Sequence, residues 1–340
     1  MRKYVNPAPV ILSYYLEISN VSNYNSAAKL PVKIILLSFT HNLLNDSEMK
    51  ITFLSILITF FVFTNCALAQ AVNNLSGIQD SLSKLSSLIW KQKTDSASLN
   101  ANEFFYKKFQ SVLKSGSSFD IPLDSIRGIT RVASDDGKMR VFTWNVPLSI
   151  GTNKYFGFIQ FMQDSLVLVP LRSVGNEVPD FENRQLNPQL WYGAIYYKLI
   201  EVKIGSVKAY TLLGWDGYTP NSNRKLIDIM YVDDSGKVVF GMPVFKTDQG
   251  IKYRVVKEYA EKATMLLRYD YQSIMVKRGK KVKKENAWLI VMDRLIPMDP
   301  SMKGMPQYYV ASGEIYDGFI FSNGFWVLVE DIEVTNQGKK

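Results

Sequence analysis

Between residues 74 and 115, apolar residues recur at a spacing of three and four, as they do along one face of an α-helix. The first such stripe consists of Leu75, Ile78, Leu82, Leu85 and Ile89. A break at Thr94-Asp95-Ser96 precedes a second helix, which we expect Asn100-Ala101-Asn102-Glu103 to cap and Gly116 to end. Its apolar stripe consists of Phe104, Phe105, Phe109, Val112 and Leu113. We expect this amphipathic pair to pack on a sheet.

From Ile129 onward, apolar and polar residues alternate, which is typical of half-buried β-strands. Glycine-containing turn sequences, such as Asp135-Asp136-Gly137-Lys138 and Ser322-Asn323-Gly324, separate the runs, with others at 204–206 and 233–236. Hairpins that follow one another without helices predict antiparallel pairing. The predicted strands are 128–134, 139–145, 155–163, 165–170, 193–204, 207–216, 225–232, 238–243, 252–256, 263–271, 274–276, 287–293, 308–315, 318–322 and 325–332.

The sequence therefore predicts a mainly β fold with an N-terminal helical segment. Its antiparallel meander is expected to form a curved sheet, a sandwich or an open barrel. A strand–Asp-Asp-(Ser)-Gly-Lys–strand unit occurs at 132–142 and again at 230–240. This repetition leaves a β-propeller-like fold as the alternative.

Residues 49–69 have the pattern of a secretory signal peptide. Met49-Lys50 is a short basic start, 51–63 is an apolar run too short to span a membrane comfortably, and Ala67-Leu68-Ala69 fits a signal peptidase site before Gln70. A retained anchor is the alternative. The residues before Cys66 do not fit a lipoprotein signal. We therefore expect a periplasmic or secreted protein with no transmembrane span after signal cleavage.

The predicted organisation follows from this signal. Residues 1–48 are interpreted as a mis-assigned upstream extension and 49–69 as the signal peptide. The helical N-terminal segment covers 70–127, the antiparallel β domain 128–335 and a short tail 336–340.

The chain has 340 residues, a formal net charge of +9, one histidine and one cysteine. His41 and Cys66 both precede Gln70, so the expected mature chain contains neither imidazole nor thiol. This excludes Ser-His-Asp and Cys-His catalysis, the common zinc sites and disulfides. We accordingly predict no cofactor and no metal, and favour a protein that is not an enzyme.

A dense group of aromatic, acidic, amide and basic residues lies in 213–225, which the pattern predicts to be a loop between strands. Such a group can stack on and hydrogen-bond a sugar or a peptide end. Alternatively, Asp216 and Asn221 satisfy backbone groups of a long hairpin. The candidate ligand-binding residues are Trp215, Asp216, Tyr218, Asn221 and Arg224.

Six cations occur within 277–284, and they suggest contact with a polyanion such as lipopolysaccharide phosphate or a cell-wall polymer. The alternative is a solvated hairpin tip. Nucleic acid is not expected, because the run has no interleaved aromatic residues for stacking. The candidate residues are Lys277, Arg278, Lys280, Lys281, Lys283 and Lys284.

Two further groups favour a structural interpretation. Asp135-Asp136 and Asp233-Asp234 could bind Ca²⁺, but the lysine that follows each favours turn formation. The aromatic residues Trp144, Trp191, Tyr192, Tyr196, Tyr197, Trp288, Trp326 and the group at 156–161 are predicted to be core and cross-strand pairs. Acidic residues that could form a glycosidase pair include Asp216, Asp293, Glu314 and Asp317, and no pair is assigned.

Several segments resemble a group of uncharacterised exported proteins of Bacteroidetes-type bacteria. These are the signal peptide ending before Gln70 and the segments 141–145, 155–159, 213–217 and 240–243. The resemblance covers most of the expected mature chain. It implies the compartment and the fold, and no catalytic residue.

Taken together, these features predict an exported, non-enzymatic binding or structural protein of the cell envelope, with an envelope component or a glycan as its partner. One alternative is a carboxylate-dependent glycan hydrolase with Asp216 as its acid. Another is an envelope assembly factor that docks through the N-terminal helices.

Overall fold

The computed structural model describes residues 77–173, 179–278 and 281–332, and for 274–278 and 281–283 it describes the backbone alone. By its contacts the chain divides into two units, Met1–Cys66 and Ala67–Lys340, and all described residues belong to the second. The predicted upstream extension, the signal peptide, His41 and the tail at 336–340 lie outside the described residues.

Two helical segments precede the first strand, as predicted. The first covers 77–89 of the described chain, and the second, α2 (Asp95–Leu113), is followed by the 3₁₀ turn η2 (Gly116–Asp120). Helix α2 begins earlier than the predicted cap at Asn100, because the Thr94 hydroxyl accepts a hydrogen bond from the Ala97 amide at 3.3 Å and caps it instead.

The buried stripe of α2 also differs from the prediction. Phe105, Phe109 and Leu113 are buried as expected, whereas Phe104 is 72% exposed. Tyr106 takes the fourth buried position, because it lies one helical turn before Phe109 on the same face. The Asn102 side chain is buried as well and accepts a hydrogen bond from the Trp144 indole at 2.7 Å.

The first sheet is an antiparallel meander of four strands in sequence order: β1 (Thr130–Ala133), β2 (Met139–Pro147), β3 (Asn153–Met162) and β4 (Leu166–Arg172). Its alternation places Phe142, Trp144 and Phe158 in a cluster with the helices, and Val141 and Ile159 in the cluster on the opposite face.

The second sheet has the order β11-β7-β6-β5, all antiparallel, with a short β8 paired to β7. Its strands are β5 (Ile195–Ile204), β6 (Val207–Thr219), β7 (Ser222–Val232), β8 (Val238–Phe240) and β11 (Val255–Ala260). The 3₁₀ turns η4 (Phe181–Asn183) and η5 (Pro188–Leu190) lie in the connection from the first sheet.

The third sheet has the order β10-β9-β15-β14-β13-β12. Its pairs are antiparallel except that of β15 with β9, which is parallel. Its strands are β9 (Phe245–Thr247), β10 (Gly250–Lys252), β12 (Leu267–Arg278), β13 (Lys281–Pro297), β14 (Tyr309–Ser322) and β15 (Phe325–Ile332). The 3₁₀ turns η6 (Pro300–Met302) and η7 (Pro306–Tyr308) join β13 to β14.

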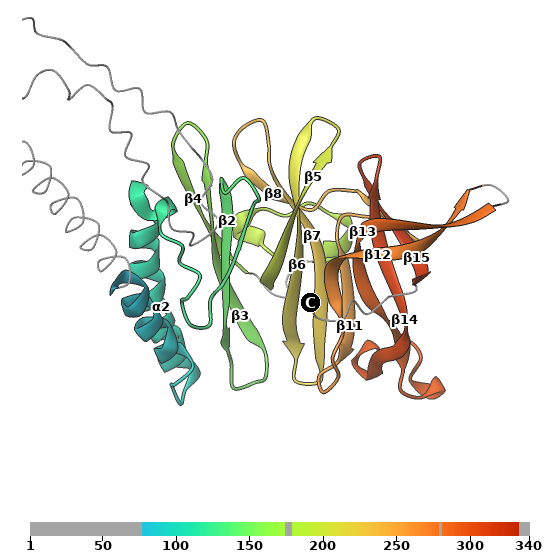
Figure 1. Ribbon diagram of the computed structural model, residues 1–340. Helices are drawn as coiled ribbons and strands as arrows, with labels where there is room; N and C mark the ends of the chain where they lie inside the picture. Colours follow the sequence, from blue (N-terminus) through green and yellow to red (C-terminus); the bar gives the residue numbers. More distant parts are fainter. Residues whose placement is uncertain (1–76, 174–178, 279–280, 333–340) are drawn as a thin grey trace, which may run out of the picture. The chain divides into compact units, whose positions relative to one another are not determined.

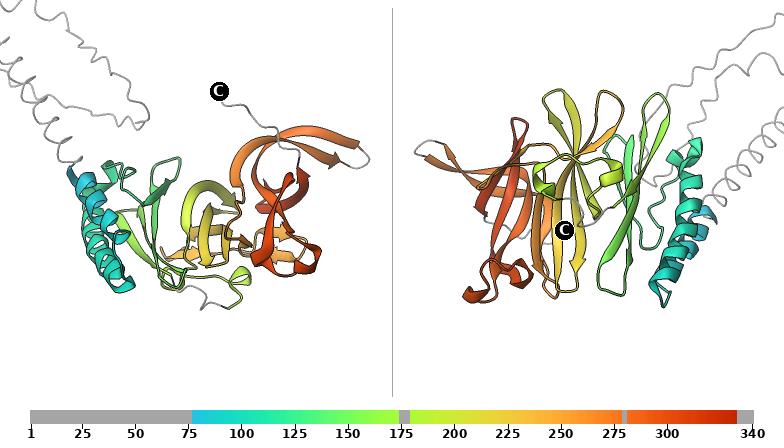
Figure 2. Two further views of the ribbon diagram at one scale, coloured as in Figure 1. Left: turned by 90° about the horizontal axis from the view of Figure 1, so that it is seen from below. Right: turned by 180° about the vertical axis from the view of Figure 1, so that it is seen from behind.

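These elements form consecutive layers: helices, first sheet, second sheet, third sheet (Figures 1 and 2). One apolar cluster lies between the helices and the first sheet, another between the first and second sheets, and a third between the second and third sheets. The prediction of a mainly β, antiparallel fold with N-terminal helices is confirmed, and a sandwich fits the arrangement. Among the described residues, no helix combines the length and the apolar character needed to cross a membrane.

The predicted turns are confirmed, and several strand boundaries are corrected. The Asp-Asp-Gly turns join β1 to β2 and β7 to β8, which are different pairs in different sheets. The predicted strand 252–256 falls across β10 and β11, and the two predicted strands 308–315 and 318–322 are one strand, β14. A register shift between Tyr316 and Gly318 lets β14 continue through the break in alternation.

Candidate functional site

The segment 213–225 is a tight hairpin rather than the predicted loop. Strand β6 runs to Thr219 and β7 begins at Ser222, so only Pro220 and Asn221 connect them. The register shifts between Asp216 and Thr219, where β6 bulges. The alternation of apolar residues did not reveal these strand ends, because polar and small residues fill both faces of the hairpin there.

Asp216 is paired with Arg224 immediately before the bulge, and its side chain is 6% exposed. The Tyr192 hydroxyl donates a hydrogen bond to Asp216 Oδ2 at 2.9 Å, and the Tyr155 hydroxyl donates a second to the same carboxylate. The Tyr155 oxygen in turn accepts from the Gly217 amide at 2.7 Å. The carboxylate is therefore held from two sides by phenol groups.

Gly217 makes this geometry possible. A Cβ atom at this position would lie 2.6 Å from Asn153 Nδ2 and 2.8 Å from the Trp215 ring. The Asn153 amide donates to the Gly217 carbonyl at 2.8 Å and fixes the bulge against β3. A larger residue at this position would therefore displace the Asn153 and Trp215 side chains.

Arg224 holds the far side of this network. Its guanidinium donates to Tyr192 Oη at 3.2 Å and to Glu258 Oε2 at 2.9 and 3.0 Å. It also lies 3.0 Å from the centre of the Tyr218 ring. Because the Tyr192 oxygen accepts from Arg224, its proton points to Asp216, so Arg224 acts as a positioning residue.

A cavity of about 620 Å³ opens beside Asp216. Helix α2, strands β3, β4 and β6, and the segment at Tyr192 contribute to its wall. The polar and aromatic residues that define its chemistry are Glu103, Tyr106, Asn153, Tyr155, Arg172, Tyr192, Asp216 and Tyr218. The volume is that of an ordinary small-molecule site.

Of the five predicted ligand-binding residues, the structure brings Asp216 and Tyr218 to this cavity. Asn221 is exposed at the hairpin turn, while Trp215 and Arg224 lie outside the lining. Sequence analysis missed Glu103 and Arg172, which come from distant elements and have no motif around them. It assigned Tyr192 to the core, where it is indeed 4% exposed, and did not detect its second role as a donor to Asp216.

Burial raises the pKa of the Asp216 carboxyl above its usual value. Hydrogen bonds from Tyr155 and Tyr192 and the charge of Arg224 act in the opposite direction and offset part of this effect. Burial and the Asp216 charge both raise the pKa of Tyr155 and of Tyr192. The two phenols therefore stay protonated donors, and the raised pKa of Asp216 means that this carboxyl takes up its proton at a higher pH than an ordinary aspartate does.

Across the cavity, Tyr106 on α2 interacts with Arg172 on β4. Burial raises the pKa of the Tyr106 hydroxyl, and the charge of Arg172 and a hydrogen bond to it partly counteract this shift. The cavity wall thus carries two exposed cations, Lys154 and Arg172, and an exposed carboxylate, Glu103, in addition to Asp216.

The other predicted residues lie elsewhere. Lys277 and Arg278 are on β12, Lys281, Lys283 and Lys284 are on β13, and Lys280 lies outside the described residues. Asp293 accepts from the Leu266 amide at 2.6 Å, and Asp317 forms an ion pair with Arg294, both in the third sheet and away from the Asp216 cavity. In the described ranges, no group of three or more His, Cys, Asp or Glu is placed to hold a metal ion.

The aspartates of the two turns bond their own backbone. Asp136 accepts from the Lys138 amide at 3.0 Å, and Asp233 accepts from the Ser235 and Lys237 amides at 2.9 Å. Most predicted core aromatics are buried, including Trp144, Trp191, Tyr196 and Trp326. Two are not: Trp288 is 55% exposed where β13 extends past its pairing with β14, and Tyr197 is 37% exposed although its hydroxyl donates to the Leu267 carbonyl at 3.0 Å.

Comparison of the chain with protein-family models, with curated proteins and with solved structures finds no match.

Proposed function

We propose that this chain is an exported, non-enzymatic binding protein of the cell envelope that holds a polar, ring-bearing ligand, such as a saccharide, in the Asp216 cavity. The observation that carries the proposal is the buried Asp216 carboxylate, held by Tyr155 and Tyr192 and facing a cavity of about 620 Å³.

The chemistry of the wall suits a saccharide. A carboxylate accepts hydrogen bonds from hydroxyl groups, and an amide such as Asn153 both donates and accepts. Tyrosine and phenylalanine rings offer apolar faces that stack on a sugar ring, and Tyr218 and Phe156 supply them here. The opposite charges of Arg172 and Glu103 leave the wall without a strong excess of either sign.

The location in the envelope rests on the signal-peptide pattern at 49–69 and on the resemblance to exported Bacteroidetes-type proteins. Sequencing of the N-terminus of the protein from its native host tests it, with Gln70 as the expected first residue.

A glycan array followed by calorimetric titration tests the binding proposal. We expect the parent chain to bind a saccharide and Asp216→Asn to bind it about 10- to 100-fold more weakly, because a hydrogen bond to a charged acceptor is lost. Asp164→Asn is the matched control, since Asp164 is exposed on the β3–β4 turn. Equal binding by Asp216→Asn and the parent would contradict the role of the cavity.

A carboxylate-dependent glycan hydrolase is the second candidate, because Glu103 lines the same cavity as Asp216 and the pKa of Asp216 is raised, as a general acid requires. Incubation with the bound glycan distinguishes the two functions. Release of new reducing ends by the parent, and not by Asp216→Asn, would replace the binding proposal by the hydrolase.

A further inference from the structure

The hairpin of β12 and β13 extends well beyond the third sheet. The two strands pair continuously from Leu267–Met292 to Arg278–Lys281, but β14 pairs with β13 only from Leu289 onward. Among the described strands, β12 is the last in the sheet and has no strand on its other side. Residues 271–278 and 281–288 therefore form a two-stranded arm, which projects from the layers in each view of Figures 1 and 2.

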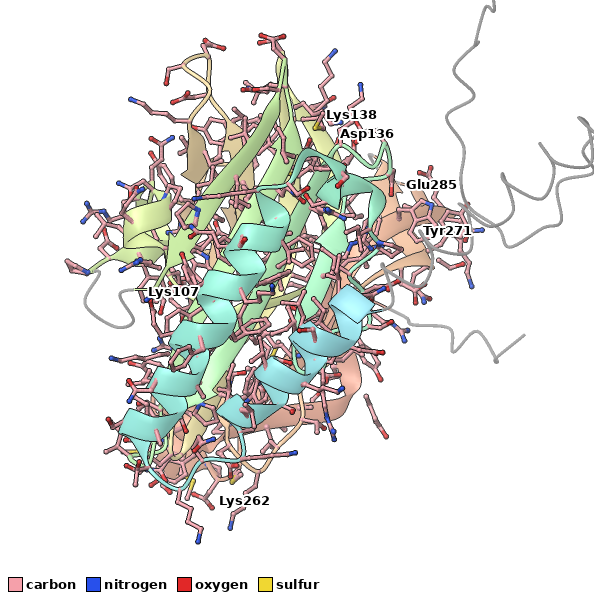
Figure 3. All side chains as sticks on the ribbon, turned by 90° about the vertical axis from the view of Figure 1, so that its left-hand side faces the viewer. Lys107, Asp136, Lys138, Lys262, Tyr271 and Glu285 are labelled. Carbon is pink, nitrogen blue, oxygen red and sulfur yellow. The ribbon has the colours of Figure 1, made fainter. Side chains whose placement is uncertain are left out.

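Two exposed aromatic residues face each other at the base of the arm. Tyr271 on β12 is opposite Trp288 on β13, with their ring centres 5.6 Å apart, and their side chains are 41% and 55% exposed. Trp288 also stacks on Tyr269 at 5.2 Å. In Figure 3 the labelled arm residues Tyr271 and Glu285 lie at the margin of the view.

The composition of the arm is unusual for a ribbon surrounded by water. The sequence places apolar residues at 274–276 and 282, although a two-stranded ribbon has little core in which to bury them. The arm also carries five cations and a single acidic residue, Glu285, which gives a net charge of +4. An environment that is apolar inside and negatively charged at its boundary would suit both the apolar residues and the net positive charge of the arm.

We propose that this arm docks on an anionic lipid surface. The basic residues would lie against the phosphate-bearing headgroups, and Trp288 and Tyr271 would lie at the boundary between headgroups and acyl chains, where amphipathic rings are favoured. Pairing with the arm of a second copy is disfavoured, because two strongly basic ribbons repel each other. A soluble polyanion would use the cations but would leave the apolar and aromatic residues in water. This inference is independent of the ligand in the Asp216 cavity.

Vesicle co-sedimentation of the full chain tests the proposal, with neutral phosphatidylcholine vesicles and vesicles that contain about one third phosphatidylglycerol. The readout is the ratio of the two partition coefficients, because the apolar run at 51–63 would contribute to both equally. We expect a ratio well above about 100 at 0.05 M salt that approaches one at 0.5 M salt, as screening shortens the range of the charges.

The triple variant Lys281→Gln, Lys283→Gln, Lys284→Gln is expected to lower that ratio on the order of 100-fold, since each cation near an anionic surface contributes about fivefold. The control variant Lys93→Gln, Lys114→Gln, Lys262→Gln makes the same change in net charge at exposed positions outside the arm, and the ratio is expected to stay near that of the parent. Lys262 is labelled in Figure 3. Circular dichroism and the thermal midpoint check that both variants fold.

A second variant tests the aromatic part of the proposal. Trp288→Ser is expected to weaken binding to anionic vesicles about tenfold at every salt concentration, because it removes an apolar contribution that salt does not screen. The docking proposal is overturned if the parent shows a ratio near one at low salt, or if the two triple variants behave alike. It is also overturned if the chain binds soluble polyphosphate through the arm lysines while it ignores anionic vesicles.

Discussion

Asp228 on β7 and Arg254, the residue before β11, form an ion pair with 3.1 Å between Oδ2 and Nε, and neither side chain is exposed to solvent. The same guanidinium donates to the carbonyl oxygens of Phe181 and Arg184. Phe181 packs edge-on against Tyr192 at 5.0 Å. The buried pair therefore supports the segment that covers Tyr192, and through it one wall of the Asp216 cavity.

Arg254→Met is expected to lower the free energy of unfolding by about 3–5 kcal/mol, because it leaves the Asp228 carboxylate buried without its counter-charge. The double variant Asp228→Leu with Arg254→Met removes both charges and is expected to be more stable than Arg254→Met alone. Urea denaturation of the parent, the two single variants and the double variant measures the coupling. Purely additive losses would contradict a direct interaction.

Tyr192→Phe removes a donor to Asp216 and an acceptor for Arg224 in one step. We expect a loss of about 1–3 kcal/mol in the free energy of unfolding, because two buried polar groups lose a partner. Tyr231→Phe is the control, since the Tyr231 hydroxyl accepts a hydrogen bond from the Gln185 side chain at 2.8 Å at an exposed site. Urea denaturation of both variants makes the comparison, and similar losses would show that Tyr192 has no special role.

The backbone bulge beside Asp216 can be tested with a single methyl group. Gly217→Ala would bring the new Cβ within 2.6 Å of Asn153 Nδ2 and 2.8 Å of the Trp215 ring, so these two side chains must shift, and Asn153 both lines the cavity and donates to the Gly217 carbonyl. We expect the saccharide affinity to fall at least tenfold and the stability to fall by about 1–3 kcal/mol. Gly116→Ala is the matched control, because no atom lies within 4 Å of its added Cβ. Calorimetry and urea denaturation give the two quantities.

Saccharide binding is expected to weaken on acidification at a higher pH than an exposed aspartate would dictate. Burial raises the pKa of Asp216, so this carboxylate takes up its proton, and stops accepting from ligand hydroxyl groups, somewhat above the usual value of about 3.9. Titrations between pH 7 and pH 4 measure the effect. Asp216→Asn should lose this pH dependence, and a pH dependence unchanged in that variant would assign it to another group.

The pKa of Asp136 is shifted in the opposite direction, and this shift affects stability. Partial burial opposes ionisation, but hydrogen bonds from Lys208 and Ser134 outweigh it and lower the pKa of Asp136 to about 2. Its folded pKa lies below the unfolded value, so its contribution is present above about pH 4 and is lost as the pH falls toward 2. Because the pair is half exposed, we expect less than about 1 kcal/mol. Urea denaturation at pH 6, 4 and 3 should show a smaller acid loss for Asp136→Asn than for the parent.

Local patterns predicted the local features of this fold and little of the site. The Asp-Asp-(Ser)-Gly and Asn-Gly turns identified three hairpins, because turn geometry depends on a few adjacent residues. The bulge at Gly217 left no such signal. Tyr155 on β3, Tyr192 before β5 and Asp216 on β6 are far apart in the sequence and come into contact only in the folded chain. No spacing pattern in the sequence predicts this contact.

Helix α2 shows the same difference between a local feature that the sequence predicts and a long-range contact that it does not. The periodic pattern predicted the helix, but the choice between Phe104 and Tyr106 as its inward residue depends on Phe158 and Trp144 in the first sheet, whose rings pack against Tyr106 at 4.7 and 6.2 Å. Side chains that complete a helix stripe are selected by the surface beneath it, which a single-sequence pattern does not contain.

Because β15 pairs in parallel with β9, this part of the third sheet can form only after β15 has been synthesised. The β9–β10 hairpin is synthesised before β12, β13 and β14 but docks on β15, the last of the described strands. Until β15 is complete, the growing chain exposes the edge of β14 and leaves Phe245 without its neighbour Trp326. We therefore expect a slow final step in maturation, in which the nascent protein depends on a holding factor to avoid aggregation.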